Sequence, residues 1–145
     1  MNLQVIKELP ITVSYGDGLV VAQIRAGNYG YVNSNVTARN FPTKMTGTAQ
    51  LKALIVAFDA RAESEQALTA FEKASLRPPL ALNETLCFGE QHPNEQMGGP
   101  IVDLGSVWRD PRGPRYVPYL WSLGSERGLG LAWFGSSWSQ NDRFL

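Results

Sequence analysis

Residues 48–77, TAQLKALIVAFDARAESEQALTAFEKASLR, decide the fold class, because no other stretch of the chain has so strong a helical pattern. Alanine recurs throughout, and residues of good helix propensity fill most of the positions between the alanines. The apolar residues of its first half follow the spacing of a stripe on one side of a helix: Leu51, Leu54, Ile55 and Phe58. We therefore predict one or two central helices over residues 48–77, which end at the proline pair that follows.

The same stretch allows a second interpretation, in which residues 51–58 form a buried strand and a single helix follows. A short apolar run does not by itself distinguish a buried strand from a buried helical segment. The high alanine content favours the helical interpretation. In that interpretation the chain bends at residues 59–63, and Ser64 is a candidate N-cap for the second helix.

Strand patterns precede the central stretch. Residues 11–15 alternate apolar and polar side chains, as in a strand that is buried on one face. The glycines of residues 16–18 suit a tight hairpin. Residues 19–25 would return as a second strand and residues 29–38 would form a third, so that the simplest topology is a meander.

Strand patterns also follow the central stretch, after a short apolar segment at residues 80–88 and a polar loop at residues 89–100. Three strands are predicted there, with a turn at residues 110–113 between the first two: residues 102–108, 116–121 and 129–133. Pro118 has no backbone N–H to donate, which indicates that the second of these strands lies at an edge or contains a bulge.

This order of strands, helices and strands predicts an α+β fold. We expect a mainly antiparallel sheet, built from the N- and C-terminal strands and packed on the central helices of residues 48–77. The 145 residues are enough for one domain with one core, so a single domain over residues 1–145 is expected. Thirteen basic and thirteen acidic side chains balance, so any binding to nucleic acid requires a local patch.

Composition also limits the cofactors and the location. Cys87 is the only cysteine, which excludes an internal disulfide and a zinc site built on several thiolates. We find no secretory signal pattern, and no apolar run reaches the length of about 18 residues that a membrane helix needs. We expect a cytoplasmic protein that binds no membrane, metal or cofactor.

Candidates for catalysis are few. Cys87 with His92 and Glu90 could form a nucleophile with its base. Glu90, His92 and Glu95, with Asp103 as a further candidate, could hold a metal ion. Neither spacing matches a motif of fixed geometry, and Cys87 lies in an apolar segment typical of an inert buried thiol. An enzyme that uses the loop of residues 90–95 is therefore the third interpretation of function, and binding is favoured over catalysis.

All four tryptophans lie within residues 108–143, together with five arginines and no lysine. Arginine binds phosphate in a fork and stacks on rings, and aromatic side chains on a sheet can stack nucleic-acid bases. Strand alternation predicts that Trp108 and Trp133 are core residues and that Trp121 and Trp138 are exposed. We expect a face that binds single-stranded nucleic acid or a nucleotide-like ligand through these residues: Arg109, Arg112, Arg115, Tyr116, Tyr119, Trp121 and Trp138.

Two alternatives remain for the aromatic side chains. They could simply fill the core of a small β-rich domain. They could also bury against another chain, because aromatic residues and arginine are common at protein interfaces. The second alternative is a protein-interaction, inhibitory or structural domain, whose partner is another protein or a second copy of the chain.

Overall fold

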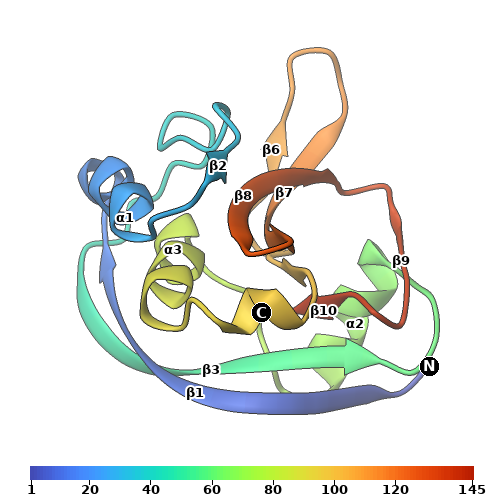
Figure 1. Cartoon of the computed structure of the whole chain (residues 1–145). Helices are drawn as coiled ribbons and strands as arrows, with labels where there is room; N and C mark the ends of the chain where they lie inside the picture. Colours follow the sequence, from blue (N-terminus) through green and yellow to red (C-terminus); the bar gives the residue numbers. More distant parts are fainter.

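A computed structural model describes all residues, 1–145, as an α+β fold around one eight-stranded mixed sheet (Figure 1). The sheet contains β1 (Leu3–Tyr15), β2 (Tyr31–Val32), β3 (Gly47–Phe58), β5 (Ile101–Val102), β6 (Trp108–Arg109), β7 (Arg115–Leu123), β8 (Glu126–Trp133) and β10 (Arg143–Phe144). A separate pair consists of β4 (Ala62–Glu63) and β9 (Ser137–Trp138). The helices are α1 (Val20–Ala26), α2 (Ser64–Lys73) and α3 (Leu82–Gln91), with 3₁₀ turns at Asp17–Leu19 and Glu95–Gly98.

The strand order is β1–β3–β10–β5–β7–β8–β2, and β6 pairs with β7 beside this path. The prediction of a mainly antiparallel sheet is corrected to a mixed one. β10 runs parallel to β5, and β2 runs parallel to β8. These parallel ladders arise because the last strand and the short second strand reach the sheet through long connections rather than through hairpins.

The stretch that suggested two helices contains a strand followed by one helix, so the second interpretation is confirmed. β3 pairs with β1 along its whole length. Its last four residues, from Ile55 to Phe58, are buried on both faces and therefore form a continuous apolar run without alternation. α2 follows, with Glu63 as its N-cap in a capping box with Gln66. Ser64 is not the N-cap, because it is the first helical residue.

The N-terminal meander is wrong beyond its first strand. Residues 11–15 are the end of the long β1, as expected. Residues 19–25 are not a strand, because the chain leaves β1 at Gly16 and winds through a 3₁₀ turn into α1. Only two residues of the predicted strand 29–38 pair with the sheet, as β2.

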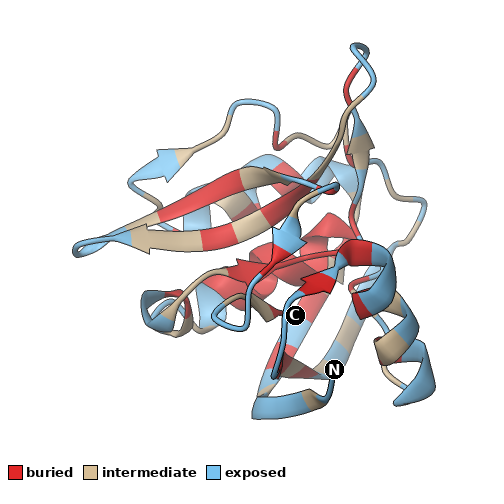
Figure 2. Cartoon of the chain, turned by 90° about the vertical axis from the view of Figure 1, so that its right-hand side faces the viewer, coloured by how far each residue is buried: buried red, intermediate tan, exposed pale blue.

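The predicted apolar segment and polar loop of residues 80–100 contain α3, which the sequence pattern did not indicate. Eight consecutive residues of α3, from Leu82 to Gly89, are buried. A helix that is buried on nearly every side has no solvent-exposed face, and so it lacks the division into an apolar and a polar side that identifies a surface helix. In Figure 2 the buried residues run through α3 and along the middle of β7 and β8.

The core divides into two clusters on opposite faces of the sheet. One contains Ile55 of β3 with Leu86 and Phe88 of α3. The other contains Val56 of β3 with Phe71 of α2, and residues near the C-terminus close it. Neighbouring residues of β3 therefore enter different clusters, as the alternation of a strand requires.

The predicted strands 116–121 and 129–133 are confirmed as β7 and β8, whereas strand 102–108 is interrupted and forms β5 and β6. β7 is a central strand, so of the two positions expected for Pro118, an edge or a bulge, the edge is wrong. The Pro118 carbonyl accepts a hydrogen bond from the Asp103 N–H at 2.9 Å, on the β5 side. The nitrogen of Pro118 faces the same side, where residues 103–107 loop out and no ladder partner is required.

Candidate functional site

Three aromatic side chains lie side by side across the end of the sheet. Tyr116 of β7 is directly opposite Trp108 of β6 and directly opposite Trp133 of β8. Directly opposite residues share a face of the sheet, so the three form one row, which we call the aromatic row. The ring centroids of Trp108 and Tyr116 are 5.9 Å apart. Trp133 is 56% exposed and the other two are half-buried, so the aromatic row opens to solvent.

The hairpin between β6 and β7 holds two exposed arginines, of which Arg109 points to the face opposite the aromatic row. Asp110 organises the turn, because its Oδ1 accepts the Arg112 N–H at 2.9 Å and its carbonyl accepts the Gly113 N–H at 2.8 Å. The Arg112 side chain hydrogen-bonds Asp110 and lowers the pKa of that carboxyl. The Arg109 side chain donates to the Gly113 carbonyl at 2.9 Å. Both arginines remain largely exposed.

The third predicted arginine, Arg115, has a different environment. It lies opposite Arg109, on the face of β7 away from the aromatic row. Its guanidinium carbon is 4.3 Å from the ring centroid of Phe134, and the side chain is half-buried. Arg115 therefore contributes a cation–π contact to the fold.

Tyr119 and Trp121 are separated from Tyr116 by the alternation of β7. They lie on the opposite face and nearer the other end of the strand. The Trp121 indole covers Gly128 so closely that a Cβ at that position would collide with the ring. The Tyr31 ring centroid lies 5.9 Å from that of Trp121. Burial raises the pKa of Tyr119, which adjoins this second aromatic group.

Trp138, which was expected to be exposed, is only 6% exposed, and this prediction is wrong. Its Nε1 donates a hydrogen bond to Ser64 Oγ at 2.8 Å, and its ring makes an edge contact with Phe144. The serines around it suggested a solvent-exposed segment, but β9 returns to pair with β4 beside α2.

The expected core position of Trp133 is also wrong. Strand alternation gave its face correctly, but nothing covers the sheet at that end.

The residues that suggested catalysis make structural contacts. Cys87 is buried, and burial raises the pKa of its thiol. His92 Nε2 lies 2.7 Å from the Pro10 carbonyl, and Glu95 forms an ion pair with Lys7 at 2.8 Å. No group of three or more histidine, cysteine, aspartate or glutamate side chains is arranged to hold a metal ion.

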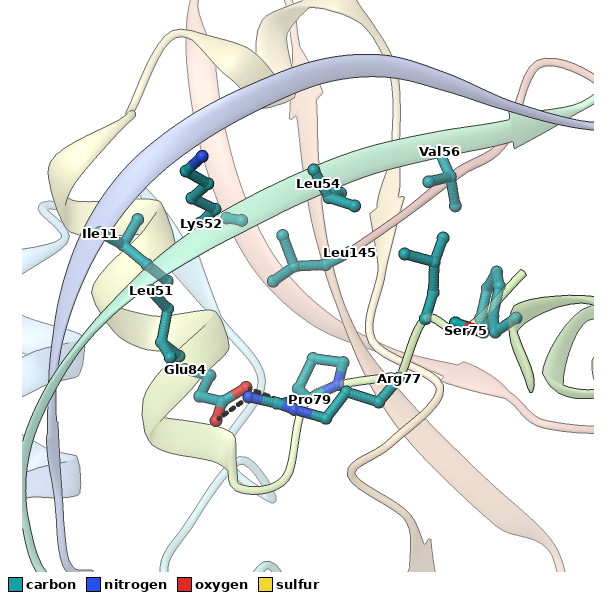
Figure 3. Close-up of a pocket in the computed structure, with 13 residues that line it drawn as sticks. Ile11, Leu51, Lys52, Leu54, Val56, Ser75, Arg77, Pro79, Glu84 and Leu145 are labelled. Carbon is teal, nitrogen blue, oxygen red and sulfur yellow. Dashed lines mark hydrogen bonds and ion pairs between the residues drawn. The ribbon is translucent and has the colours of Figure 1, made fainter. Parts of the chain in front are cut away.

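A cavity of about 230 Å³ lies beside β3, and we call it the β3 groove (Figure 3). Most of its lining is apolar and comes from separate parts of the chain: Ile11, Leu51, Ala53, Leu54, Val56, Phe71, Leu76, Pro79 and Leu145. At one end Arg77 forms an ion pair with Glu84 at 3.0 Å. The hydroxyl of Tyr15 donates to the same carboxylate at 2.6 Å, and burial together with this bond raises the pKa of Tyr15 to about 12. Sequence patterns did not indicate the groove, because its walls meet only through tertiary folding.

Comparisons of this chain with protein-family models, with curated proteins and with solved structures find no match. None of the helices has the length and apolar character needed to cross a membrane.

Proposed function

We propose that this protein is a non-enzymatic binding module that holds single-stranded nucleic acid by stacking bases on the aromatic row. The observation that carries this proposal is the position of Trp108, Tyr116 and Trp133 at directly opposite sites on three neighbouring strands. Such a row offers ring surfaces at the strand spacing of about 5 Å. Bases of any sequence can stack on them, because every base has a π-face.

The charges of the β6–β7 hairpin support a phosphate-bearing ligand. Residues 108–116 contain three arginines and one aspartate in a chain whose net charge is zero. Arg109 and Arg112 are the two exposed cations of this hairpin; Arg109 projects from the face opposite the aromatic row, and Arg112 is paired with Asp110 at 3.3 Å. Each carries donors that match phosphate oxygens. Two phosphate contacts correspond to a modest salt dependence, with a slope of log K against log salt of about −1.4 for a single strand.

Fluorescence anisotropy of labelled single-stranded RNA and DNA tests the proposal at low and moderate salt. Trp133→Ala is expected to weaken binding roughly 5- to 150-fold, since a stacked base contributes about 1–3 kcal/mol. Leu123→Ala is the matched control, because Leu123 is 76% exposed on the same sheet but lies at the far end of β7. Its affinity should equal that of the wild type.

Two outcomes would refute the nucleic-acid proposal: no saturable binding at low salt, or equal affinities of Trp133→Ala and wild type. The same variant distinguishes the protein-interaction alternative, because exposed aromatic residues also anchor protein interfaces. If light scattering shows an oligomer that Trp133→Ala dissociates, the aromatic row is a subunit interface.

A further inference from the structure

β3 has one edge that is unpaired along most of its length. On one side it pairs with β1 from Gly47 to Phe58. On the other side β10 pairs only with Val56 and Ala57. Residues 47–55 therefore have no strand partner on that side. An edge of this kind presents N–H and C=O groups that can pair with another chain.

The direction of these groups follows from their partners on β1. The N–H and C=O of Thr12 are both bonded to the Gln91 side chain, at 3.0 and 2.7 Å, so they point away from β3. In an antiparallel ladder a residue that points outward lies opposite one that also points outward. Gln50 is opposite Thr12, so its backbone groups face the open edge, and those of Lys52 and Leu54 follow by alternation. No loop or side chain of the protein hydrogen-bonds these groups.

The fold blocks the corresponding edge of β1. Besides Gln91, the side chain of Gln23 donates to the Ser14 carbonyl at 2.8 Å, and His92 Nε2 lies 2.7 Å from the Pro10 carbonyl. Side chains from α1 and from the end of α3 thus occupy the positions of a neighbouring strand on β1. On β3 the same positions are free.

The open edge of β3 is also a wall of the β3 groove (Figure 3). Residues 75–79 form the facing wall, and Leu145 lies between the two walls. The volume of about 230 Å³ is partly open to solvent and can accept apolar side chains. Two exposed charged side chains border the groove, Lys52 and Arg77. Both are cationic, and each also pairs with a carboxylate of the protein, Lys52 with Glu8 at 3.2 Å and Arg77 with Glu84 at 3.0 Å.

We propose that the β3 groove binds an extended peptide, which adds to β3 as an antiparallel strand in line with β10. The peptide backbone would bond to the outward-facing groups of Lys52 and Leu54, the mode of recognition known as strand addition. An apolar peptide side chain would enter the cavity, and an acidic one would lie near Lys52 or Arg77. The site is separate from the aromatic row, so it does not depend on the function proposed above.

The variant Lys52→Pro tests the backbone bond, with Lys52→Thr as its matched control. Both variants remove the charge, but only proline removes the outward-facing N–H, and proline is tolerated where a strand's N–H faces outward. Pro10, directly opposite on β1, already occupies such a position. Linear peptides selected from a phage-displayed library against the wild type, then synthesised and labelled, are the probe. We expect the affinity to fall at least tenfold further in Lys52→Pro than in Lys52→Thr. Equal affinities of the two variants, or a library without a saturable binder, would overturn the proposal.

Amide hydrogen exchange of the wild type gives a readout that does not require the proline variant to fold. The amides of Gln50, Lys52 and Leu54 should exchange quickly in the free protein and slowly with the peptide bound. Those of Leu51 and Ala53 face β1 and should be slow in both states. Binding without this alternating protection would refute strand addition. If instead the wild type is a dimer and Lys52→Pro is a monomer, the edge pairs with a second copy and the peptide proposal is wrong.

Discussion

Replacement of Asp103 by asparagine is expected to stabilise the protein at neutral pH and to remove one source of its pH dependence. Asp103 follows β5 and is completely buried. Its carboxylate accepts hydrogen bonds from Thr85 Oγ1 at 2.7 Å and from the N–H groups of Gly105 and Ser106 at 2.8 and 3.0 Å. Burial outweighs these hydrogen bonds and raises the pKa of Asp103 from 3.8 to about 6.

The sign of the effect follows from proton binding in the two states. Between about pH 4 and pH 6 the folded state of the wild type holds a proton on Asp103 that the unfolded chain has released. The free energy of unfolding therefore falls as the pH rises through this window, and the contribution is constant above it. A rise in pKa of about two corresponds to ~3 kcal/mol at 1.36 kcal/mol per pH unit. Asparagine keeps an oxygen that can accept from Gly105 and Ser106, and it carries no charge to bury.

Urea unfolding of wild type and Asp103→Asn, followed by tryptophan fluorescence from pH 4 to pH 8, measures this effect. The two proteins should differ little at pH 4, and at pH 7 the variant should be more stable by up to about 3 kcal/mol. Subtracting the two profiles cancels the contributions of Asp59 and Asp110, whose lowered pKa values act in the opposite direction. A variant that is less stable at every pH, with a profile parallel to that of the wild type, would refute the reasoning. Hydrogen bonding would then outweigh the burial of charge.

Two further predictions concern residues whose roles the sequence left open. Trp138→Ala should lower the free energy of unfolding by about 3–5 kcal/mol, because it removes a buried indole. Trp133→Ala should change that free energy by less than about 1 kcal/mol, because Trp133 is exposed. Urea titration measures both variants, and a larger loss for Trp133→Ala would contradict the structure. Cys87 should resist iodoacetamide in the native protein and react only in urea, because it is buried and its thiol pKa is raised; rapid labelling of the native protein would restore it as a candidate nucleophile.

Two of the elements that sequence patterns predicted have one buried face. The end of β1 alternates buried and less buried side chains, and α2 has an apolar stripe between polar positions. β7 and β8 are buried on both faces near mid-strand, so turn residues at their ends rather than alternation indicated them. The last four residues of β3 and nearly all of α3 are buried on every side, so neither shows a period that separates helix from strand. For β3, the alanine content then favoured a helix, which was the wrong structure.

The exposure of the tryptophans could not be predicted for a different reason. Alternation assigned Trp133 to the face of Leu129 and Leu131, and this is its face in the sheet. Leu129 is fully buried, because it belongs to the core cluster that α3 helps to form on this face of the sheet. Trp133 lies beyond the segments that pack on this face. How far these segments extend over the sheet depends on tertiary folding, which a local sequence pattern does not predict. Trp138 is the converse case, because a polar segment returns to the core through the β4–β9 pair.

The aromatic row and the β3 groove have a common origin in the unequal lengths of the strands. β1 and β3 have 13 and 12 residues, whereas β5, β6 and β10 have two each. Since β10 reaches only Val56 and Ala57, the rest of that edge of β3 is left without a partner. Since β5 and β6 meet β7 at separate places, the β6–β7 hairpin extends beyond the packed part of the sheet and carries its arginines into solvent. The same short central strands therefore account both for an unpaired backbone edge and for a projecting aromatic surface, and each is suited to a different kind of ligand.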